Sequence, residues 1–251
     1  MEKTNNKPKV IMSTVAVAFI ALLIGLAFLP AVRQNATSAS AYAERDGEAM
    51  RVLGCCGAYA ATHDFQSTLD GKIKARVFGI PHTLTVRGGR TVNGDEFCDV
   101  QESVSALVKK GLKRQCLDGK YSAVFGEYKN KSFAYGEPTS TTRDGYIAAY
   151  GKPSVGICKY ELENSVISAT CAGDGVYVFK LDPRRATAYS RNEIKTVLDC
   201  SDPEYESVEL TVVSDGERAT KITVCEKFRV DRFGGTHCAF TYSEVFSYAQ
   251  V

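Results

Sequence analysis

A long uncharged run near the start of the sequence constrains the fold more than any other feature. The run begins at Val10, ends at Leu29 and reads VIMSTVAVAFIALLIGLAFL. As a helix it would extend for about 30 Å, which matches the hydrocarbon core of a bilayer. We therefore predict a transmembrane anchor over residues 10–32, with the lipid bilayer as its partner.

Two other interpretations of this run stay open. The apolar part of a cleavable secretory signal is usually about 7 to 15 residues, which is shorter than this run, and the small-residue site at Ala39 lies well beyond it. The run also loosely resembles the N-terminal helix of type IV pilins. Those helices carry a Glu within the run, whereas no acidic residue lies between Lys9 and Arg33. A pilin-like filament subunit, with the apolar helix in the filament core, is therefore an alternative.

The charges on either side of the run predict its orientation. Lys3, Lys7 and Lys9 precede it, and only Arg33 follows it closely. By the positive-inside rule, residues 1–9 form a cytoplasmic tail and the remainder is exported. The predicted localisation is a single-pass membrane protein whose main domain is extracytoplasmic, in a periplasmic, lumenal or cell-surface space.

The same tail accounts for the net charge of the chain. The sequence contains 31 basic and 29 acidic residues, which gives a formal charge of +2. Without Glu2 and the three lysines of the tail, basic and acidic residues are equal in number. Bulk attraction to nucleic acid is therefore not expected, and we predict no nucleic-acid partner.

Nine cysteines in an exported chain favour disulfide bonds over free thiols. We predict a hairpin in which residues 157–163 and 166–172 are joined by a tight turn. In this register Cys158 and Cys171 are opposite one another. Their α carbons would then be about 4.5 Å apart, which is within disulfide range, so we predict a bond between them.

The adjacent residues Cys55 and Cys56 are the most unusual local feature of the sequence. They could link to another chain or act as a redox switch, and the odd number of cysteines favours the interchain link. The simpler alternative is that their side chains point to different parts of the fold.

Patterning along the rest of the chain predicts strands with a few helices. Residues 33–47 are small and polar and form a predicted tether. Beyond them, alternating residues and short turns predict a largely antiparallel sheet. The clearest predicted helix covers residues 100–115, because Asp99 and Glu102 form a capping-box pattern ahead of regularly spaced apolar residues. A second helix is predicted over residues 190–199, where Ser190 and Glu193 form another capping-box pattern. Hairpins are predicted over residues 120–135 and over residues 207–230, the latter with Leu210 opposite Ile222.

The predicted fold class is α+β. It consists of a single N-terminal transmembrane helix followed by a largely antiparallel, disulfide-stabilised sheet domain with two or three helices. The exported domain covers residues 48–251. It could consist of two related halves, at about 70–150 and 151–251, because each half contains a predicted helix, then a cysteine, then a hairpin.

No spacing of catalytic residues is recognisable. Phosphate-binding loops, a nucleophile elbow and a paired-histidine helix are all missing from the sequence. His63, His82 and His237 are each more typical of surface or structural positions. His237 with Cys238 and Cys225 could be a metal site, but the paired cysteine spacing of zinc sites is absent. We therefore predict no catalytic residue, no cofactor and no metal.

One group of basic residues is a candidate anion-binding site. Lys227 and Arg229 share the polar face of a predicted strand, and Arg232 lies near its end. The alternative is that these charges protect an exposed strand from edge-to-edge association.

These features favour a noncatalytic protein whose exported domain is a structural or protein-binding subunit of a membrane or surface assembly. Its partners would be other proteins or copies of itself. The pilin-like filament subunit is the first alternative. An extracytoplasmic enzyme or thiol redox protein that uses Cys55 and Cys56, or the region of His237, is the second.

Overall fold

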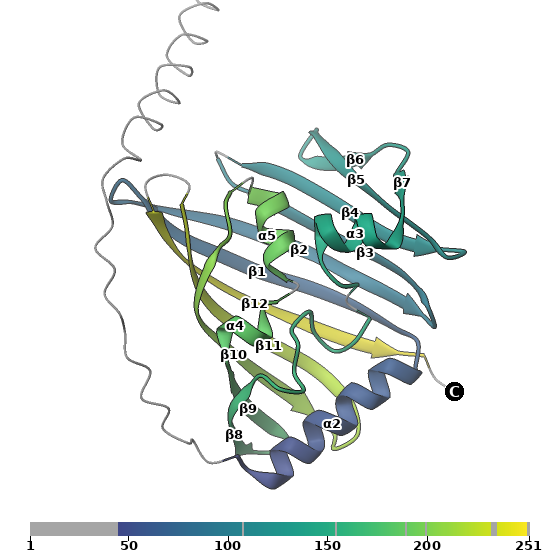
Figure 1. The fold of residues 1–251 in the computed structure, drawn as a ribbon, viewed down its shortest axis with the longest axis vertical. Helices are drawn as coiled ribbons and strands as arrows, with labels where there is room; N and C mark the ends of the chain where they lie inside the picture. Colours follow the sequence, from purple (N-terminus) through teal and green to yellow (C-terminus); the bar gives the residue numbers. More distant parts are fainter. Residues whose placement is uncertain are drawn as a thin grey trace, which may run out of the picture.

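The computed structural model shows one large sheet with helices on one side (Figure 1). Twelve strands form the sheet in the order β6-β5-β4-β3-β2-β1-β12-β11-β10-β9-β8, and β7 pairs with β5. Every pair of neighbouring strands is antiparallel. The described residues are 45–106, 108–153, 155–188, 190–198, 200–231 and 235–249.

The strand bounds are β1 (Phe65–Val77), β2 (Ile80–Asn93), β3 (Glu96–Val104), β4 (Lys109–Leu117), β5 (Lys120–Lys129), β6 (Ser132–Tyr135), β7 (Thr139–Thr141), β8 (Val166–Gly173), β9 (Val176–Leu181), β10 (Glu204–Ser214), β11 (Ala219–Val230) and β12 (Thr236–Tyr248). The helix bounds are α2 (Gly47–Thr62), α3 (Arg143–Tyr150), α4 (Pro183–Ala186) and α5 (Ser190–Leu198).

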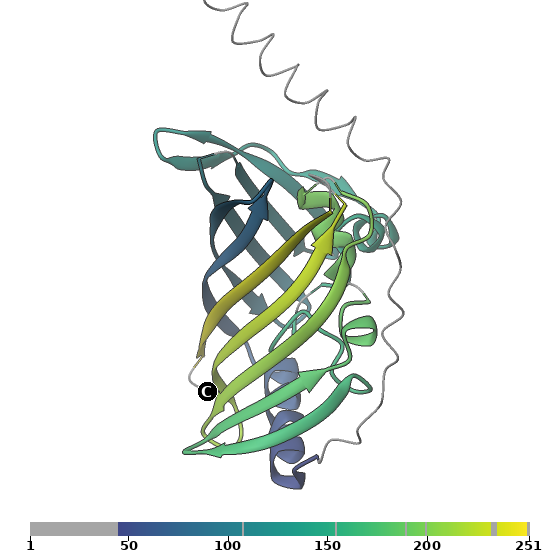
Figure 2. The ribbon, with the colours of Figure 1, turned by 90° about the vertical axis from the view of Figure 1, so that its left-hand side faces the viewer.

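Two meanders meet at the centre of the sheet. Strands β1 to β6 follow one another outward in one direction, and β12 back to β8 follow in the other. The two meanders join where β1 pairs with β12, from Phe65 opposite Tyr248 to Ala75 opposite Cys238. The sheet is strongly twisted, and β8 to β12 lie nearest the viewer in Figure 2. The suggested relationship between the two halves of the sequence stays a prediction.

Alternating residues give the sheet two different faces. On β11, Ile222, Val224 and Phe228 are fully buried, whereas Lys221 and Lys227 are exposed. Side chains two residues apart lie on the same face of a strand, so this pattern separates core from solvent. We call the side that carries the core the inner face, and the other side the outer face.

Helix α2 covers part of the inner face (Figure 1). It begins after Asp46, whose carboxylate accepts a hydrogen bond from the backbone N–H of Ala49 at 2.9 Å. Such a cap satisfies one of the unpaired donors at the start of a helix. Val52 and Cys56 of this helix are fully buried against the sheet. The inner face is therefore closed by a helix and not by a second sheet.

Close approach between strands requires glycine at the centre of the sheet. A Cβ atom at Gly88 would lie 2.0 Å from the carbonyl oxygen of Val100. One at Gly89 would lie 2.2 Å from the carbonyl oxygen of Ser67. Both distances are far shorter than a van der Waals contact, so β2 can pack this tightly between β1 and β3 only with glycine here.

The helix predicted over residues 190–199 is confirmed as α5, but the helix predicted over residues 100–115 is wrong. The latter residues belong to β3 and β4, and Asp99 is opposite Arg114 across the two strands. A short apolar pattern can fit either structure, and pairing with neighbouring strands decides between them.

The predicted α+β class with an N-terminal transmembrane helix is wrong. One antiparallel sheet dominates the described residues, and helices are short additions to its inner face. Among these residues, no helix combines the length and the apolar character needed to cross a bilayer. The run from Val10 to Leu29 lies outside the described residues. We withdraw the membrane anchor, the bilayer partner and the single-pass localisation on this finding.

The predicted disulfide framework is also wrong, because all nine cysteines are free. The expected hairpin between Cys158 and Cys171 does not form. Residues of β8 pair with β9, so that Cys171 is opposite Tyr177, and Cys158 lies outside the sheet. The fold is held by a continuous apolar core in place of covalent cross-links.

Candidate functional site

A buried ion pair lies at the centre of the inner face. Arg90 of β2 and Glu244 of β12 stand on either side of β1, with side chains 7% and 4% exposed. The Nε of Arg90 donates to Oε1 of Glu244 at 2.7 Å, and the hydroxyl of Ser67 on β1 donates to the same oxygen at 2.5 Å. Charges at this depth are costly to bury unless they are paired, so each of the three residues depends on the others.

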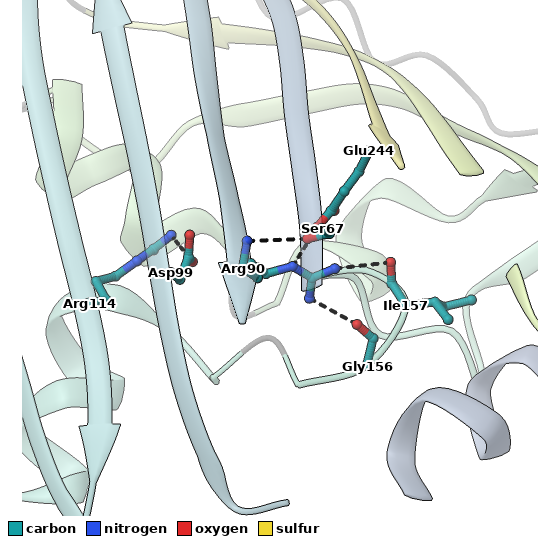
Figure 3. Close-up of polar contacts among 7 residues, drawn as sticks. All are labelled: Ser67, Arg90, Asp99, Arg114, Gly156, Ile157 and Glu244. Atoms are coloured by element: carbon teal, nitrogen blue, oxygen red, sulfur yellow. Dashed lines mark hydrogen bonds and ion pairs between the residues drawn. The ribbon is translucent and has the colours of Figure 1, made fainter. Parts of the chain in front are cut away.

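Arg90 also holds a segment that lies over the inner face. We call residues 155–165 the cover segment. The terminal nitrogens of Arg90 donate to the carbonyl oxygens of Gly156 at 2.9 Å and Ile157 at 3.4 Å (Figure 3). The guanidinium carbon lies 5.4 Å from the ring centre of Phe65. Arg90 thus connects the sheet directly to the cover segment.

The electrostatic surroundings of Arg90 keep it charged. Burial lowers the pKa of the guanidinium, but the charges of Glu244 and Asp99 and the hydrogen bond to Glu244 together raise it by more. The pKa of Arg90 is therefore above its ordinary value. A permanently charged group in an apolar layer must always have an anion or strong acceptors beside it.

A row of alternating charge extends from this pair across the neighbouring strands. Arg90 is opposite Asp99 on β3, and Asp99 is opposite Arg114 on β4. Nη2 of Arg114 lies 2.5 Å from Oδ2 of Asp99, and the Arg114 side chain is 6% exposed (Figure 3). All these residues occupy inner-face positions, where apolar side chains are the rule.

A second buried acid contacts the cover segment further along. The phenolic O–H of Tyr160 donates to Oε2 of Glu226 at 2.5 Å. Burial raises the pKa of Tyr160 well above its ordinary value, and the charge of Glu226 adds to this effect. Lys159 lies 5.8 Å from the ring centres of both Phe240 and Tyr242. Polar contacts to β2 and β11, and a cation against two rings of β12, thus hold the cover segment.

A cavity of about 50 Å³ lies against the inner face beside these contacts. Its lining combines aromatic rings with charged groups: Tyr146, Tyr150, Phe240 and Tyr242 supply the rings, and Arg90, Arg114, Lys152, Lys159, Asp99 and Glu244 supply the charges. Cationic groups outnumber carboxylates in this lining. At this size the cavity holds a few water molecules, so a larger ligand requires the cover segment to move.

The adjacent cysteines have different surroundings. Cys56 is buried and donates to the hydroxyl of Ser214 at 3.2 Å, whereas Cys55 is partly exposed and lies 3.9 Å from Nη1 of Arg51. Burial raises the pKa of Cys56, which disfavours the reactive thiolate. Interchain or redox chemistry at this pair stays a prediction.

The residues considered as a metal site do not come together. His237 lies on the outer face, with Nδ1 at 2.8 Å from Oε1 of Glu206, whereas Cys238 is buried on the inner face. Cys225 is exposed on the outer face and is opposite Thr241 in the neighbouring strand. Successive residues of a strand point to opposite faces, which separates His237 from Cys238.

The candidate anion-binding residues are only partly described. Lys227 and Arg229 lie on the outer face of β11, as the alternation predicts, and Arg232 lies outside the described residues. Arg229 is opposite His237, and Lys227 is opposite Ala239. Anion binding by this group of three stays a prediction.

The other two histidines lie apart from the cavity lining. His63 follows α2 and stacks on Tyr59 with ring centres 3.8 Å apart. His82 lies near the start of β2, opposite Ala75. Both positions fit structural roles.

Arg90, Glu226 and Glu244 were not predicted as site residues, although the two glutamates carry a detectable pattern. Glu226 stands between Val224 and Phe228, and Glu244 between Tyr242 and Phe246, at positions two residues away on the same strand face. A charge at a core position of a strand must have a buried partner, and buried ionisable groups are concentrated at functional sites.

Comparisons with known proteins add little to this geometry. No protein-family model matches the chain, and no curated protein matches it. Among solved structures, a DUF1329 family protein from Desulfovibrio piger ATCC 29098 is 9% identical, with 80% of this chain and 91% of that chain covered and a TM-score of 0.34. LolA superfamily protein NE2245 from Nitrosomonas europaea is 10% identical, with coverages of 81% and 94% and a TM-score of 0.30. MucB in complex with MucA(peri) is 8% identical, with coverages of 81% and 98% and a TM-score of 0.12. These TM-scores are below 0.5, so none of the three carries an argument about this chain.

Proposed function

We propose that this chain is a noncatalytic binding protein that holds an apolar molecule with an anionic group between its inner face and its cover segment. The mixed lining of the cavity carries the proposal, because aromatic rings stand beside a majority of cationic groups. Ligand sites are typically apolar hollows with a few placed polar groups that fix the orientation of the ligand.

The cover segment must open for such a ligand to enter. Pockets for small molecules usually measure about 300 to 1,000 Å³, whereas this cavity measures about 50 Å³. The cover segment contains no helix or strand and is connected to the sheet by the bonds of Arg90 and Tyr160. Opening the segment breaks the bonds from the terminal nitrogens of Arg90 to the carbonyl oxygens of Gly156 and Ile157. A carboxylate or a phosphate is a stronger acceptor for a guanidinium than a backbone carbonyl is.

The retention of a buried charged row supports a role beyond stability. The free energy needed to desolvate two charges is about as large as their mutual attraction. Apolar residues of similar volume would therefore stabilise the sheet at least as well as Arg90 and Glu244. Arginine also recognises planar anions through two parallel hydrogen bonds. The arrangement therefore favours recognition of an anion at this place in the sheet.

The test is a fluorescence titration of the full-length chain with cis-parinaric acid and with its uncharged methyl ester. We expect saturable binding of the acid, and binding of the ester weaker by about tenfold, because one charge-assisted contact is worth about 1.4 kcal/mol or more. Lys152→Glu, at the edge of the cavity, should weaken binding of the acid. Lys120→Glu, exposed at the start of β5, is the matched control. The proposal fails if the acid shows no saturable binding, or if both variants bind it equally.

A protein partner is the second candidate, because the edge of the sheet at β8 is suited to strand addition. Ile167 on this strand is 42% exposed, and the carbonyl oxygen of Ala169 already accepts a hydrogen bond from the backbone of Asp46 at 3.0 Å. Edge strands pair readily with extended segments of other chains. A photoreactive residue in place of Ile167 should crosslink to such a partner, and its absence from all crosslinked products would count against this function.

The remaining alternatives rest on other parts of the chain. The filament subunit depends on the run from Val10 to Leu29, which lies outside the described residues. The enzyme or thiol redox protein depends on Cys55 and Cys56 or on the region of His237. Both stay predictions.

A further inference from the structure

The outer face carries a hollow that is separate from the cavity beneath the cover segment. It has a volume of about 510 Å³ and lies over β9 to β12. Short side chains form its floor: Ser207, Cys225, Ala239 and Thr241. The register accounts for this floor, because Cys225 is opposite Thr241 and Lys227 is opposite both Ser207 and Ala239.

Four lysines surround this floor. Lys180 and Lys227 line the hollow directly. On the neighbouring strand β1, Lys72 and Lys74 are each opposite a residue of the floor and lie on the same face. All four side chains are exposed. Within the described part of the chain, none of these four ammonium groups has a carboxylate oxygen within 4.0 Å.

Three glutamates line the hollow, but the side chain of Glu226 is buried and bonded to Tyr160 on the inner face. The two glutamates of the outer face do not cancel the lysines. Glu206 lies 2.8 Å from Nδ1 of His237. Glu209 lies between Lys180 and Cys225 in the cross-strand register. The two lining lysines match these two carboxylates, and the excess of positive charge around the floor comes from Lys72 and Lys74 on the neighbouring strand.

We infer that this hollow binds a phosphate group, carried by the free ion or by a phospholipid headgroup. A phosphate offers several acceptor oxygens and up to two negative charges, so it can engage more than one lysine at once. The hydroxyl groups of Ser207 and Thr241 on the floor supply further donors. Of the two described residues that were predicted from sequence to bind an anion, Lys227 lines this hollow and Arg229 does not. The exposed lysines make the binding dependent on ionic strength.

The alkylation rate of Cys225, on the floor of the hollow, can report whether phosphate is bound there. The full-length protein is alkylated with N-ethylmaleimide at increasing concentrations of inorganic phosphate, with ionic strength held constant by sodium chloride. Mass spectrometry of peptides gives the rate at each cysteine. We expect phosphate to slow alkylation of Cys225 in a saturable manner and to leave the partly exposed Cys55 unchanged, because Cys55 lies on α2.

Charge reversal on β11 supplies the matched pair of variants. Lys227→Glu should weaken phosphate binding about tenfold, because it replaces an attraction with a repulsion of similar size. Lys221→Glu makes the same change on the same strand and face, but Lys221 is opposite Val213 and Val245 and does not line the hollow. It should bind phosphate as the unmodified chain does.

A vesicle arm separates the two sources of phosphate. The protein is floated with phosphatidylcholine vesicles that contain phosphatidic acid, and with vesicles of phosphatidylcholine alone. Protection of Cys225 by free phosphate shows that the ion suffices. Flotation that requires phosphatidic acid and Lys227, without protection by free phosphate, identifies a lipid headgroup. The inference is overturned if neither occurs, or if Lys221→Glu and Lys227→Glu have equal effects. Lys152→Glu should leave both measurements unchanged, which separates this site from the cavity under the cover segment.

Discussion

Arg90 and Glu244 form an ion pair across β1, although their own strands are not neighbours in the sheet. Ser67 on the intervening strand donates to the same oxygen of Glu244. The pair therefore connects the two meanders through side chains, in addition to the backbone pairing of β1 with β12. Removing either charge leaves the other buried.

Replacement of Arg90 by Met should lower the free energy of unfolding by about 3 to 5 kcal/mol, because Glu244 then remains buried without its cation. Urea unfolding of the single variant measures this loss. The double variant Arg90→Met/Glu244→Met should recover most of it, since two apolar residues can replace a buried pair. Losses that simply add in the double variant would contradict this account.

The bond between Tyr160 and Glu226 should control local opening of the cover segment. Tyr160→Phe removes the donor and should cost about 1 to 3 kcal/mol, because an acceptor is left buried. Hydrogen exchange should become faster in residues 155–165 and stay unchanged in β9. Tyr128→Phe in the β5–β6 hairpin is the matched control. Equal exchange in both variants would show that this bond does not hold the segment.

Buried thiols should make stability decline at alkaline pH. Burial raises the pKa of both Cys158 and Cys238 from 9.0 to about 11. As the pH rises from about 9 to about 11, the unfolded chain loses thiol protons that the folded chain retains. The contribution of these two thiols to the free energy of unfolding is therefore fully present below about pH 9 and is lost by about pH 11. As the pH rises through this range, the urea midpoint should fall less steeply for Cys238→Ala than for the unmodified chain. The exposed control Cys225→Ala should show the same decline as the unmodified chain.

Two glycine substitutions should have opposite effects. Gly88→Ala places a Cβ atom 2.0 Å from a backbone oxygen of Val100 and should destabilise the fold by about 1 to 3 kcal/mol or more. Gly54→Ala lies within α2 with no heavy atom within 4 Å of the added carbon, and it should stabilise the fold by up to about 1 kcal/mol. Thermal unfolding measures both. A stable Gly88→Ala variant would show that β2 can move away from β3.

Local patterns predicted some elements well. The helix at residues 190–199 has its own capping pattern, and the hairpin of β5 and β6 has its own turn, so neither depends on distant residues. The hairpin over residues 207–230 was predicted with Leu210 opposite Ile222, and this register is wrong by two positions, because Leu210 is opposite Val224 on the same face. Period-two alternation fixes the face of a residue, because a shift of two positions preserves it.

The charged row could not be derived from local spacing. Asp99 and Arg114 fitted the start and end of a helix, yet they face one another across β3 and β4. Arg90 and Glu244 are brought together by the pairing of β1 with both β2 and β12. Only this long-range register turns scattered charges into a site, and no periodicity within one segment contains that information.

The seam between β1 and β12 joins the first and last strands of this sheet to be synthesised. Until β12 leaves the ribosome, β1 is a long unpaired edge strand of the β1 to β6 meander, and such edges associate readily with other chains. Lys72 and Lys74 place positive charges on this edge before β12 pairs with it. A chain that stops before Thr236 therefore loses the middle of its sheet, and its two meanders would have no backbone contact with each other.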